Sequence, residues 1–449
     1  MKWATRLLIG VTLVFAPWAF GCTEPWSLKV LEWLCLGSAI SFLLEQRRQP
    51  KLQIRYPWVF VLGCLLLFLV GAQLVNPLEL RTIAHWSVYD LVRGDRSWPH
   101  TINWLATLKE GTRWACFLLF GFVAAHHIKT RQDFFFILAI LVINTVLVSL
   151  EGILQALSDC RQLLWFRIPR HGGDIFGPFV CRNNFVSYAN LALPFALGLA
   201  LFPGMRSGRD HDSQTPQRFF WAFCAAVLFA AVVVSGSRAG VLVSLTIVCV
   251  MIFDLVWRRA RSSSQKQPWS IWFLLLLGGG FVALSGGTLE LKRRFYETDW
   301  LEPTRVEIWK ASWNAATESL WWGHGLGTFR YLFPFYKPMD ILLFYEYAHN
   351  DWLEAIFDLG VVGFGLLILL VVSILVLVAK ERIFKTSSFR RSVATATFVS
   401  LMGCLGHALV DFPLHIAAVQ ITFITVTALG LASSFLNSAS GHHSSGSGP

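Results

Sequence analysis

The sequence predicts an all-α polytopic integral membrane protein that crosses the bilayer about twelve times and carries a large helical loop outside the membrane. Hydrophobic residues make up 55% of the 449 residues and charged residues only 14%, which is too few to cover a soluble protein of this length. Uninterrupted apolar runs recur along the chain, for example Val59–Val75 and Phe134–Leu150. Each run approaches the ~20 residues that a helix needs to cross the hydrocarbon.

These apolar runs define the predicted membrane helices. They cover residues 7–21, 28–44, 57–75, 111–126, 134–157, 184–202, 219–235, 239–257, 270–285, 355–379, 393–410 and 415–436. The first of them is interpreted as a membrane helix and not as a cleaved signal, because another apolar run follows at once and no small-residue cleavage site is evident.

The distribution of charge orients the helices. With the N-terminus in the cytoplasm, most Lys and Arg residues fall in cytoplasmic loops such as 46–51, 127–131, 258–261 and 380–391. Membrane proteins show this asymmetry, so the net charge of +11 indicates topology and not nucleic-acid binding. We expect a multi-pass membrane protein with its working face on the non-cytoplasmic side.

Two periplasmic segments are long enough to form structure of their own. Residues 76–110 contain Trp86, Trp98 and Trp104 and predict an interfacial helix or lid, since Trp concentrates at headgroup depth. Residues 286–354 form the largest loop and predict a periplasmic subdomain, a kind of segment that often carries function.

The 286–354 loop has internal order. A helical pattern runs from Arg305 to Leu320, followed by a glycine-containing turn at 323–327 and an aromatic run over 329–336. One face of the predicted helix carries Ile308, Trp309, Ser312, Trp313 and Ala316.

The chain divides into five predicted regions. These are N-terminal spans with the interfacial segment (1–110), central spans (111–285), the periplasmic subdomain (286–354), C-terminal spans (355–437) and a disordered Ser/Gly/His tail (438–449). Cys160 and Cys181 both fall outside the spans, and the sequence leaves open whether they form a disulfide.

Three arginines at the outer face are candidate ligands for an anion. Arg238 lies in the turn SGSRAG (235–240), whose small residues would let a bulky ligand approach the backbone. Arg305 opens the predicted helix of the large loop, and Arg182 opens a membrane helix, where its charge opposes the helix dipole unless an anion is near. Alternatively, Arg238 is an interfacial side chain reaching the headgroups, and Arg305 is a surface ion pair with Asp299, Glu302 or Glu307.

His349 is the candidate general base. It precedes a membrane helix in AHNDWLE (348–354), where Asp351 and Glu354 are expected to orient its ring and raise its basicity. A structural histidine and a metal site built from His349, Asp351 and Glu354 are the alternatives. The metal site lacks a second His or a Cys pair at the required spacing, so we expect no metal and no cofactor.

Four stretches together resemble the O-antigen ligase/polymerase superfamily of bacterial membrane glycosyltransferases. They are GPFVCRNNF (177–185), SGSRAG (235–240), the block from Arg305 through WWGHGLGTF (321–329), and AHNDWLE followed by DLGVVG (348–363). Their order and spacing agree with the family over roughly residues 130–380. Within the first stretch, Cys181 stands where relatives often carry Asn, and Asn184 where they often carry His.

The resemblance implies a metal-independent, inverting transfer of a glycan from undecaprenyl pyrophosphate to an acceptor hydroxyl, at the periplasmic face of a bacterial inner membrane. Arg238 and Arg305 would hold the donor pyrophosphate, with Arg182 as a further contact, and His349 would act on the acceptor hydroxyl. Asn350, Asp351 and Glu354 would contribute to substrate binding, and the aromatic run 329–336 would stack on sugar faces. The implied acceptor is lipid A-core or another glycan. The protein would contact the lipid bilayer and bind no nucleic acid.

The sequence does not separate a ligase from an O-antigen or exopolysaccharide polymerase of the same superfamily. A lipid-linked sugar or polysaccharide transporter is the alternative from a different class, because about twelve spans is also a common transporter plan. A transporter places ionisable groups near the bilayer midplane, whereas here the polar residues gather at the outer boundary.

Overall fold

The structure is a computed structural model in which every described element is helical. It describes residues 2–47, 52–78, 95–158, 160–169, 174–202, 205, 211–260, 303–384 and 387–436. Within these ranges no strand forms, and only three isolated β-bridges occur. The predicted all-α class is therefore confirmed.

The helices follow the order of the predicted spans. They are α1 (Lys2–Trp18), α2 (Pro25–Gln46), α3 (Pro57–Val75), α4 (Trp104–His127), α5 (Arg131–Leu157), α6 (Arg182–Leu201), α7 (His211–Val234), α8 (Arg238–Ala260), α11 (Pro303–Thr317), α12 (Phe329–Leu332), α13 (Asp351–Phe384), α14 (Ser388–His407) and α15 (Ala417–Ser433), with short 3₁₀ turns at η1 (Phe20–Cys22), η3 (Phe333–Phe335) and η4 (Pro413–His415).

Each predicted span that falls on described residues coincides with a helix, and the span 57–75 has the bounds of α3. The predicted span at 270–285 lies outside the described residues. Among the described helices, seven are long and apolar enough to cross a membrane, and α1 and α15 are shorter apolar helices. The chain is thus a polytopic membrane protein.

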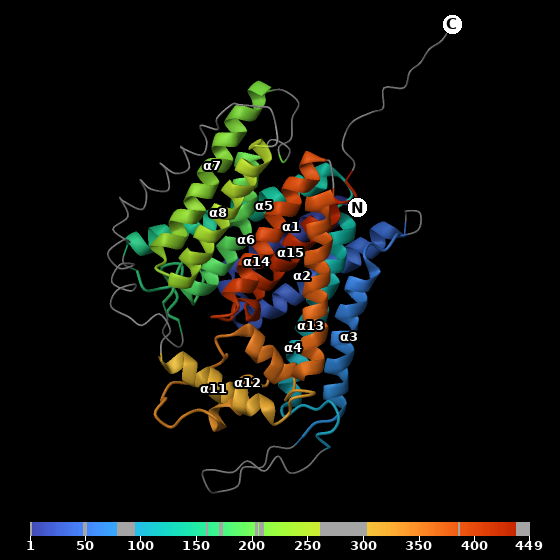
Figure 1. Ribbon diagram of the computed structural model, residues 1–449, viewed down its shortest axis with the longest axis vertical. Coiled ribbons are helices and arrows are strands. Elements are labelled where there is room, and N and C mark those ends of the chain that lie inside the picture. The colour runs from blue at the N-terminus through green and yellow to red at the C-terminus, as the bar shows by residue number, and fades with distance from the viewer. Residues whose placement is uncertain are drawn as a thin grey trace.

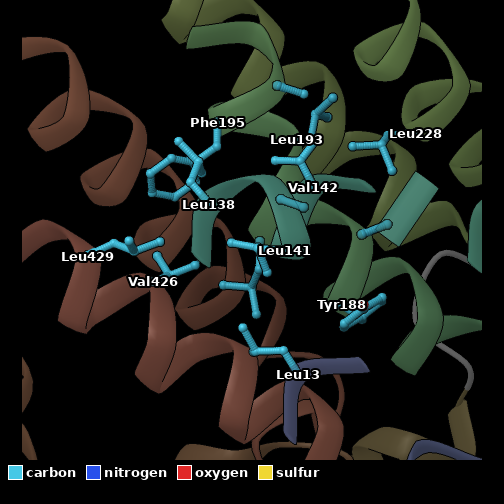
Figure 2. Packing of buried hydrophobic residues seen from close by; sticks show 14 of the residues in the cluster. Leu13, Leu138, Leu141, Val142, Tyr188, Leu193, Phe195, Leu228, Val426 and Leu429 are labelled. Carbon is cyan, nitrogen blue, oxygen red and sulfur yellow. The ribbon is translucent and has the colours of Figure 1, made fainter. Parts of the chain in front are cut away.

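The helix α6 forms the centre of the bundle. Its apolar window is completely buried, and α5, α7, α8, α14 and α15 pack around it (Figure 1). Figure 2 shows part of the core, where Leu13 of α1, Leu141 of α5 and Val426 of α15 converge. Because membrane helices gain little from burying apolar surface against one another, close packing and interhelical hydrogen bonds must hold this centre together.

A buried asparagine links three helices at this level. The Asn144 Nδ2 donates to the Tyr188 hydroxyl at 3.1 Å, and the Asn144 Oδ1 accepts from the Trp18 indole at 2.8 Å. Interhelical bonds of this kind fix the positions of α1, α5 and α6, since an unpaired amide would be costly in hydrocarbon.

The described part of the large loop folds as a subdomain beyond one end of the bundle, where α11 and α12 lie (Figure 1). Its separate core includes Ile308, Ala315, Phe329 and Phe333, together with Phe357 of α13. This core places the start of α11 over the first turn of α13.

The helical pattern predicted from Arg305 is confirmed by α11, but one residue was assigned to the wrong face. Trp313 is 47% exposed, while the buried face consists of Ile308, Ala311, Ser312, Ala315 and Ala316. Small alanines lie inside because they let α11 approach α13 closely. The aromatic run was also misread in part: Phe329 and Phe333 stack on each other inside the core, 4.8 Å between ring centroids, and are not available to sugars.

Residues 79–94 of the segment predicted as an interfacial helix or lid, Trp86 among them, lie outside the described residues, so this stays a prediction. Trp98 is exposed, and Trp104 begins α4. Backbone hydrogen bonds hold the residues before α4: the Leu78 N–H donates to Thr101 O at 2.8 Å, and the Ile102 N–H donates to His324 O at 3.0 Å. Cys160 and Cys181 are free thiols, so the structure contains no disulfide between them.

Candidate active site

His349 lies in a constrained turn immediately before α13. Its φ of 51° is in the left-handed region, which a residue with a Cβ adopts only when its surroundings enforce it. The flanking backbone supplies that constraint. The Ala348 N–H donates to Glu354 Oε2 at 2.7 Å, and the Asp351 N–H donates to Ala408 O at 3.0 Å. The turn therefore holds the imidazole at a defined place.

The carboxylate that orients His349 is Asp411, in the connection between α14 and α15. The His349 Nδ1 lies 3.2 Å from Asp411 Oδ1, and the Asp411 side chain is buried. The expectation that Asp351 and Glu354 orient the ring is therefore wrong. A proton on Nδ1 directed at Asp411 leaves Nε2 as the basic nitrogen, which is the arrangement that general-base catalysis requires.

The charge of Asp411 is maintained by its neighbours. Burial alone would raise the pKa of this carboxyl, but His349, His407 and Arg305 outweigh burial and lower its pKa below the usual value. Asp411 thus remains ionised at neutral pH, and an ionised carboxylate stabilises a positive charge that forms on His349.

Arg305 lies beside this pair. It is in the first turn of α11, and its Nη1 donates to Val410 O at 2.9 Å, one residue before Asp411. Of the three acids predicted as surface partners for Arg305, Asp299 and Glu302 lie outside the described residues. The subdomain core described above thus brings Arg305 to the connection that carries Asp411.

Arg182 begins α6, as predicted, and pairs with Asp174 across the turn before the helix. The neighbouring Cys181 is half-buried; the loss of solvent around its thiol raises the pKa to about 11, and the charge of Asp411 adds to this effect. Asp411 is therefore near the start of α6. The anion predicted beside Arg182 is, in this structure, a carboxylate of the chain itself.

Arg238 begins α8 directly after a turn in which Gly236 has a φ of 69°. Two residues after Arg238, Gly240 lies so close to Val186 of α6 that a Cβ would overlap it. The next residue, Ser187, bonds His407 Nδ1 at 2.8 Å. The start of α8 and the end of α14 therefore contact adjacent positions on α6, which places Arg238 at the same end of the bundle as His407.

Asp351 and Glu354 have a different partner from the one expected. The His415 Nδ1 lies 2.6 Å from Asp351 Oδ1, and the His415 Nε2 lies 3.1 Å from Glu354 Oε1. Burial lowers the pKa of His415, but the two carboxylates outweigh burial and raise the pKa well above its usual value. Asn350 accepts from the Trp352 and Leu353 N–H groups at 3.1 Å and so caps α13.

The predicted site residues do not include His407, Asp411 or His415. All three belong to the stretch GHALVDFPLH (406–415), in which His407 ends α14 and the other two follow it. Ionisable groups at such a boundary are a functional signal in their own right, and they could have been found from the sequence. Three buried atoms near this stretch, Asn184 Oδ1, His407 Nε2 and Asp411 Oδ2, have no hydrogen-bond partner among the described residues.

The fold and site define a class: a multi-pass membrane protein with a half-buried His paired to a buried Asp, and with arginines at one end of the bundle. Comparison with known families agrees with this class. Residues 223–368 match the family model described as O-Antigen ligase, and this stretch contains Arg238, Arg305 and His349. The match confirms the resemblance to the O-antigen ligase superfamily. No curated protein matches the chain.

Proposed function

We propose that the protein is a glycosyltransferase that moves a glycan from undecaprenyl pyrophosphate to an acceptor hydroxyl at the periplasmic face of a bacterial inner membrane. The observation that carries the proposal is the His349–Asp411 pair with Arg305 beside it. The O-antigen ligase match to residues 223–368 supports a role of this kind.

In the proposed reaction, His349 Nε2 removes the proton of the acceptor hydroxyl as the oxygen attacks the anomeric carbon. The bond between that carbon and the pyrophosphate oxygen breaks, and the configuration inverts. Asp411 stabilises the imidazolium that results, and the proton then leaves to solvent or to the departing pyrophosphate. Proton transfer of this kind contributes ~10²–10⁴-fold to the rate.

Arg238, Arg305 and Arg182 supply positive charge for the leaving pyrophosphate. Guanidinium groups bind phosphate oxygens in a bidentate manner and keep their charge at every physiological pH. We therefore propose that the donor needs no divalent cation. Activity that persists in a chelator supports this point, and activity restored by one specific cation contradicts it.

Asn350, Asp351 and Glu354 were predicted to bind substrate. Their side chains hold the start of α13 and the 411–416 connection, through the contacts with His415 and with backbone N–H groups. We propose that they act as positioning residues, because the connection that they hold carries Asp411.

The experiment combines purified, detergent-solubilised protein with an undecaprenyl-pyrophosphate-linked oligosaccharide, with and without lipid A-core. A glycosylated lipid A-core establishes a ligase. A ladder of lengthened lipid-linked glycan without added acceptor establishes a polymerase. Absence of any turnover, followed by movement of the lipid-linked sugar across vesicles that contain the protein, would establish a transporter instead.

A further inference from the structure

A second feature of the bundle is an elongated cavity between α3, α4, α13 and α15. Its volume is ≈ 290 Å³ and its wall is largely apolar. Side chains from all four helices contribute, including Phe60, Phe117, Leu367 and Phe423. A cavity of this kind between membrane helices suits a hydrocarbon chain.

The cavity is as long as a lipid chain requires. Along α4 its lining extends from Glu110 to Ala125, which is about 22 Å at ~1.5 Å per residue. The hydrocarbon core of a bilayer is ~30 Å thick, so the cavity follows α4 through most of one membrane.

Polar atoms without hydrogen-bond partners gather at one end of the cavity. Asp358 and Arg113 are 2% and 6% exposed, and Gln420 lies on the first turn of α15. The atoms Asp358 Oδ1, Arg113 Nε and Gln420 Oε1 have no hydrogen-bond partner among the described residues. Buried polar atoms are normally satisfied, so these atoms point to a ligand with polar groups at this end.

The positively charged side chains that line this end already have partners, so they do not suit a pyrophosphate. Carboxyl groups of Glu110, Asp351 and Asp358 line it together with Arg113 and His415. Arg113 is already paired with Glu110, and His415 with Asp351. Arg182, Arg238 and Arg305 do not line the cavity. Hydroxyl groups, which both donate and accept, complement the carboxylate, amide and guanidinium atoms here.

We propose that this cavity binds one hydrocarbon chain of the acceptor lipid, with a hydroxyl-bearing part of its head group at Asp358, Gln420 and Arg113. That the bound lipid is the acceptor rests on the proposed function, whereas the presence of a lipid site does not. Two stacked aromatic rings, Tyr347 and Phe412, then connect this end of the cavity to His349. Between ring centroids, Tyr347 lies 4.8 Å from His415 and 4.7 Å from Phe412, and Phe412 lies 4.8 Å from His349.

The site is tested by photo-crosslinking of the full-length protein in nanodiscs with two diazirine probes. One is a glycosyl diacylglycerol with an uncharged, hydroxyl-rich head, and the other is a polyprenyl pyrophosphate. Val371 lines the cavity, so Val371→Trp fills it. Val372→Trp is the matched control, because Val372 is 48% exposed on the outside of α13. Leu367→Trp is a second filling variant, in case the first reduces folding.

The proposal expects the glycosyl probe to label peptides of α4 and α15, with labelling at least fivefold lower in Val371→Trp and unchanged in Val372→Trp. Preferential labelling by the polyprenyl pyrophosphate, or equal labelling in both folded Trp variants, overturns it. Crosslinking needs no turnover. Specific labelling in a protein without transferase activity would therefore preserve the lipid site and reject the proposed function.

Discussion

The geometry of His349 couples backbone strain to the chemistry we propose. A non-glycine residue in the left-handed region costs of order 1–3 kcal/mol, which the surrounding contacts must offset. The strain is offset by the hydrogen bonds on either side, from Ala348 to Glu354 and from Asp351 to Ala408. The turn thereby presents Nδ1 to Asp411, and a helix continued through residue 349 would place the ring elsewhere.

Asp411→Asn tests the pairing. The amide has nearly the same shape but cannot stabilise an imidazolium, so we expect transfer to fall by about 10²–10⁴-fold while donor binding is kept. Single-turnover rates at saturating donor measure the effect. Asp340→Asn, at an exposed carboxyl, is the matched control. A rate within threefold of wild type would remove Asp411 from the mechanism.

Arg238→Lys and Arg305→Lys test whether the guanidinium groups bind pyrophosphate. Lysine keeps the charge but loses the bidentate contact, so we expect kcat/KM for the donor to fall by at least about tenfold in each variant. Arg330→Lys is the matched control, because Arg330 is half-exposed and pairs loosely with Glu346 at 3.7 Å. Wild-type kinetics in Arg238→Lys would return Arg238 to an interfacial role.

At this scale, the sequence indicated His349 and Arg305 but not the partner of either. His349 and Asp411 are 62 residues apart, and Asp351 and His415 are 64 residues apart. Asp351 and Glu354 are near His349 in the sequence, and that proximity produced the wrong partner. Which carboxylate meets which histidine depends on how α14 ends and α15 begins, and local spacing carries no information about that.

At the scale of elements, the connection between α14 and α15 is the part that assembles the site. It carries Asp411 toward His349, and Val410 contributes the carbonyl that binds Arg305. The first turn of α13 holds it from the other side through His415. Three helices therefore have to dock before the catalytic pair can form.

The pH dependence of stability tests this His415 contact. The pKa of His415 is raised by its two carboxylate partners, so its ion pairs add to the free energy of unfolding. This contribution is complete below about pH 6.5, the usual pKa of histidine, and is lost as the pH rises through the raised pKa. We expect His415→Gln to destabilise the protein by about 3–5 kcal/mol at pH 7, because the buried Asp351 and Glu354 lose their partner.

Thermal unfolding between pH 6 and pH 10, followed by scanning fluorimetry, measures the difference between wild type and His415→Gln. The difference should shrink at alkaline pH. Lys310→Gln, an exposed change in the same subdomain, should leave the unfolding temperature unchanged at each pH. A difference that is constant across the range would show that His415 is not held as a charged group.

Helices themselves were the most predictable elements, because a long apolar run in a membrane protein leaves the backbone little alternative. The side of a helix that packs was less predictable. In α11 the alanines are inside and Trp313 is outside. The packing partner is Phe357, 40 or more positions away on α13, and close contact there favours small residues over large ones.

At the scale of the whole molecule, the two ends of the bundle carry different kinds of charge. At the site end, Asp411 and His349 pair beside Arg305. The helices α8 and α13 begin at that end, and near their other ends Asp254 pairs with Arg258 at 2.7 Å and Arg382 at 3.2 Å. Arg258 and Arg382 belong to the basic stretches 258–261 and 380–391, which were predicted to lie in the cytoplasm.

The sequence predicted the bundle and the end at which the large loop lies, because hydropathy and charge asymmetry are summed over many residues. It could not predict the cavity between α3, α4, α13 and α15. The wall of that space includes small residues such as Gly63 and Gly121. Glycines are common in membrane helices, so they indicate a cavity only when the helices that face them are known.

The most direct test of the central claim is transfer of glycan from an undecaprenyl-pyrophosphate donor to lipid A-core by purified wild type, by His349→Ala and by the exposed control Asp340→Ala. Donor binding is measured in parallel on the same preparations. The account predicts transfer by wild type and Asp340→Ala, and a loss of at least about 10²-fold in His349→Ala with donor binding retained. Undiminished transfer by folded His349→Ala would contradict the assignment of His349 as the base.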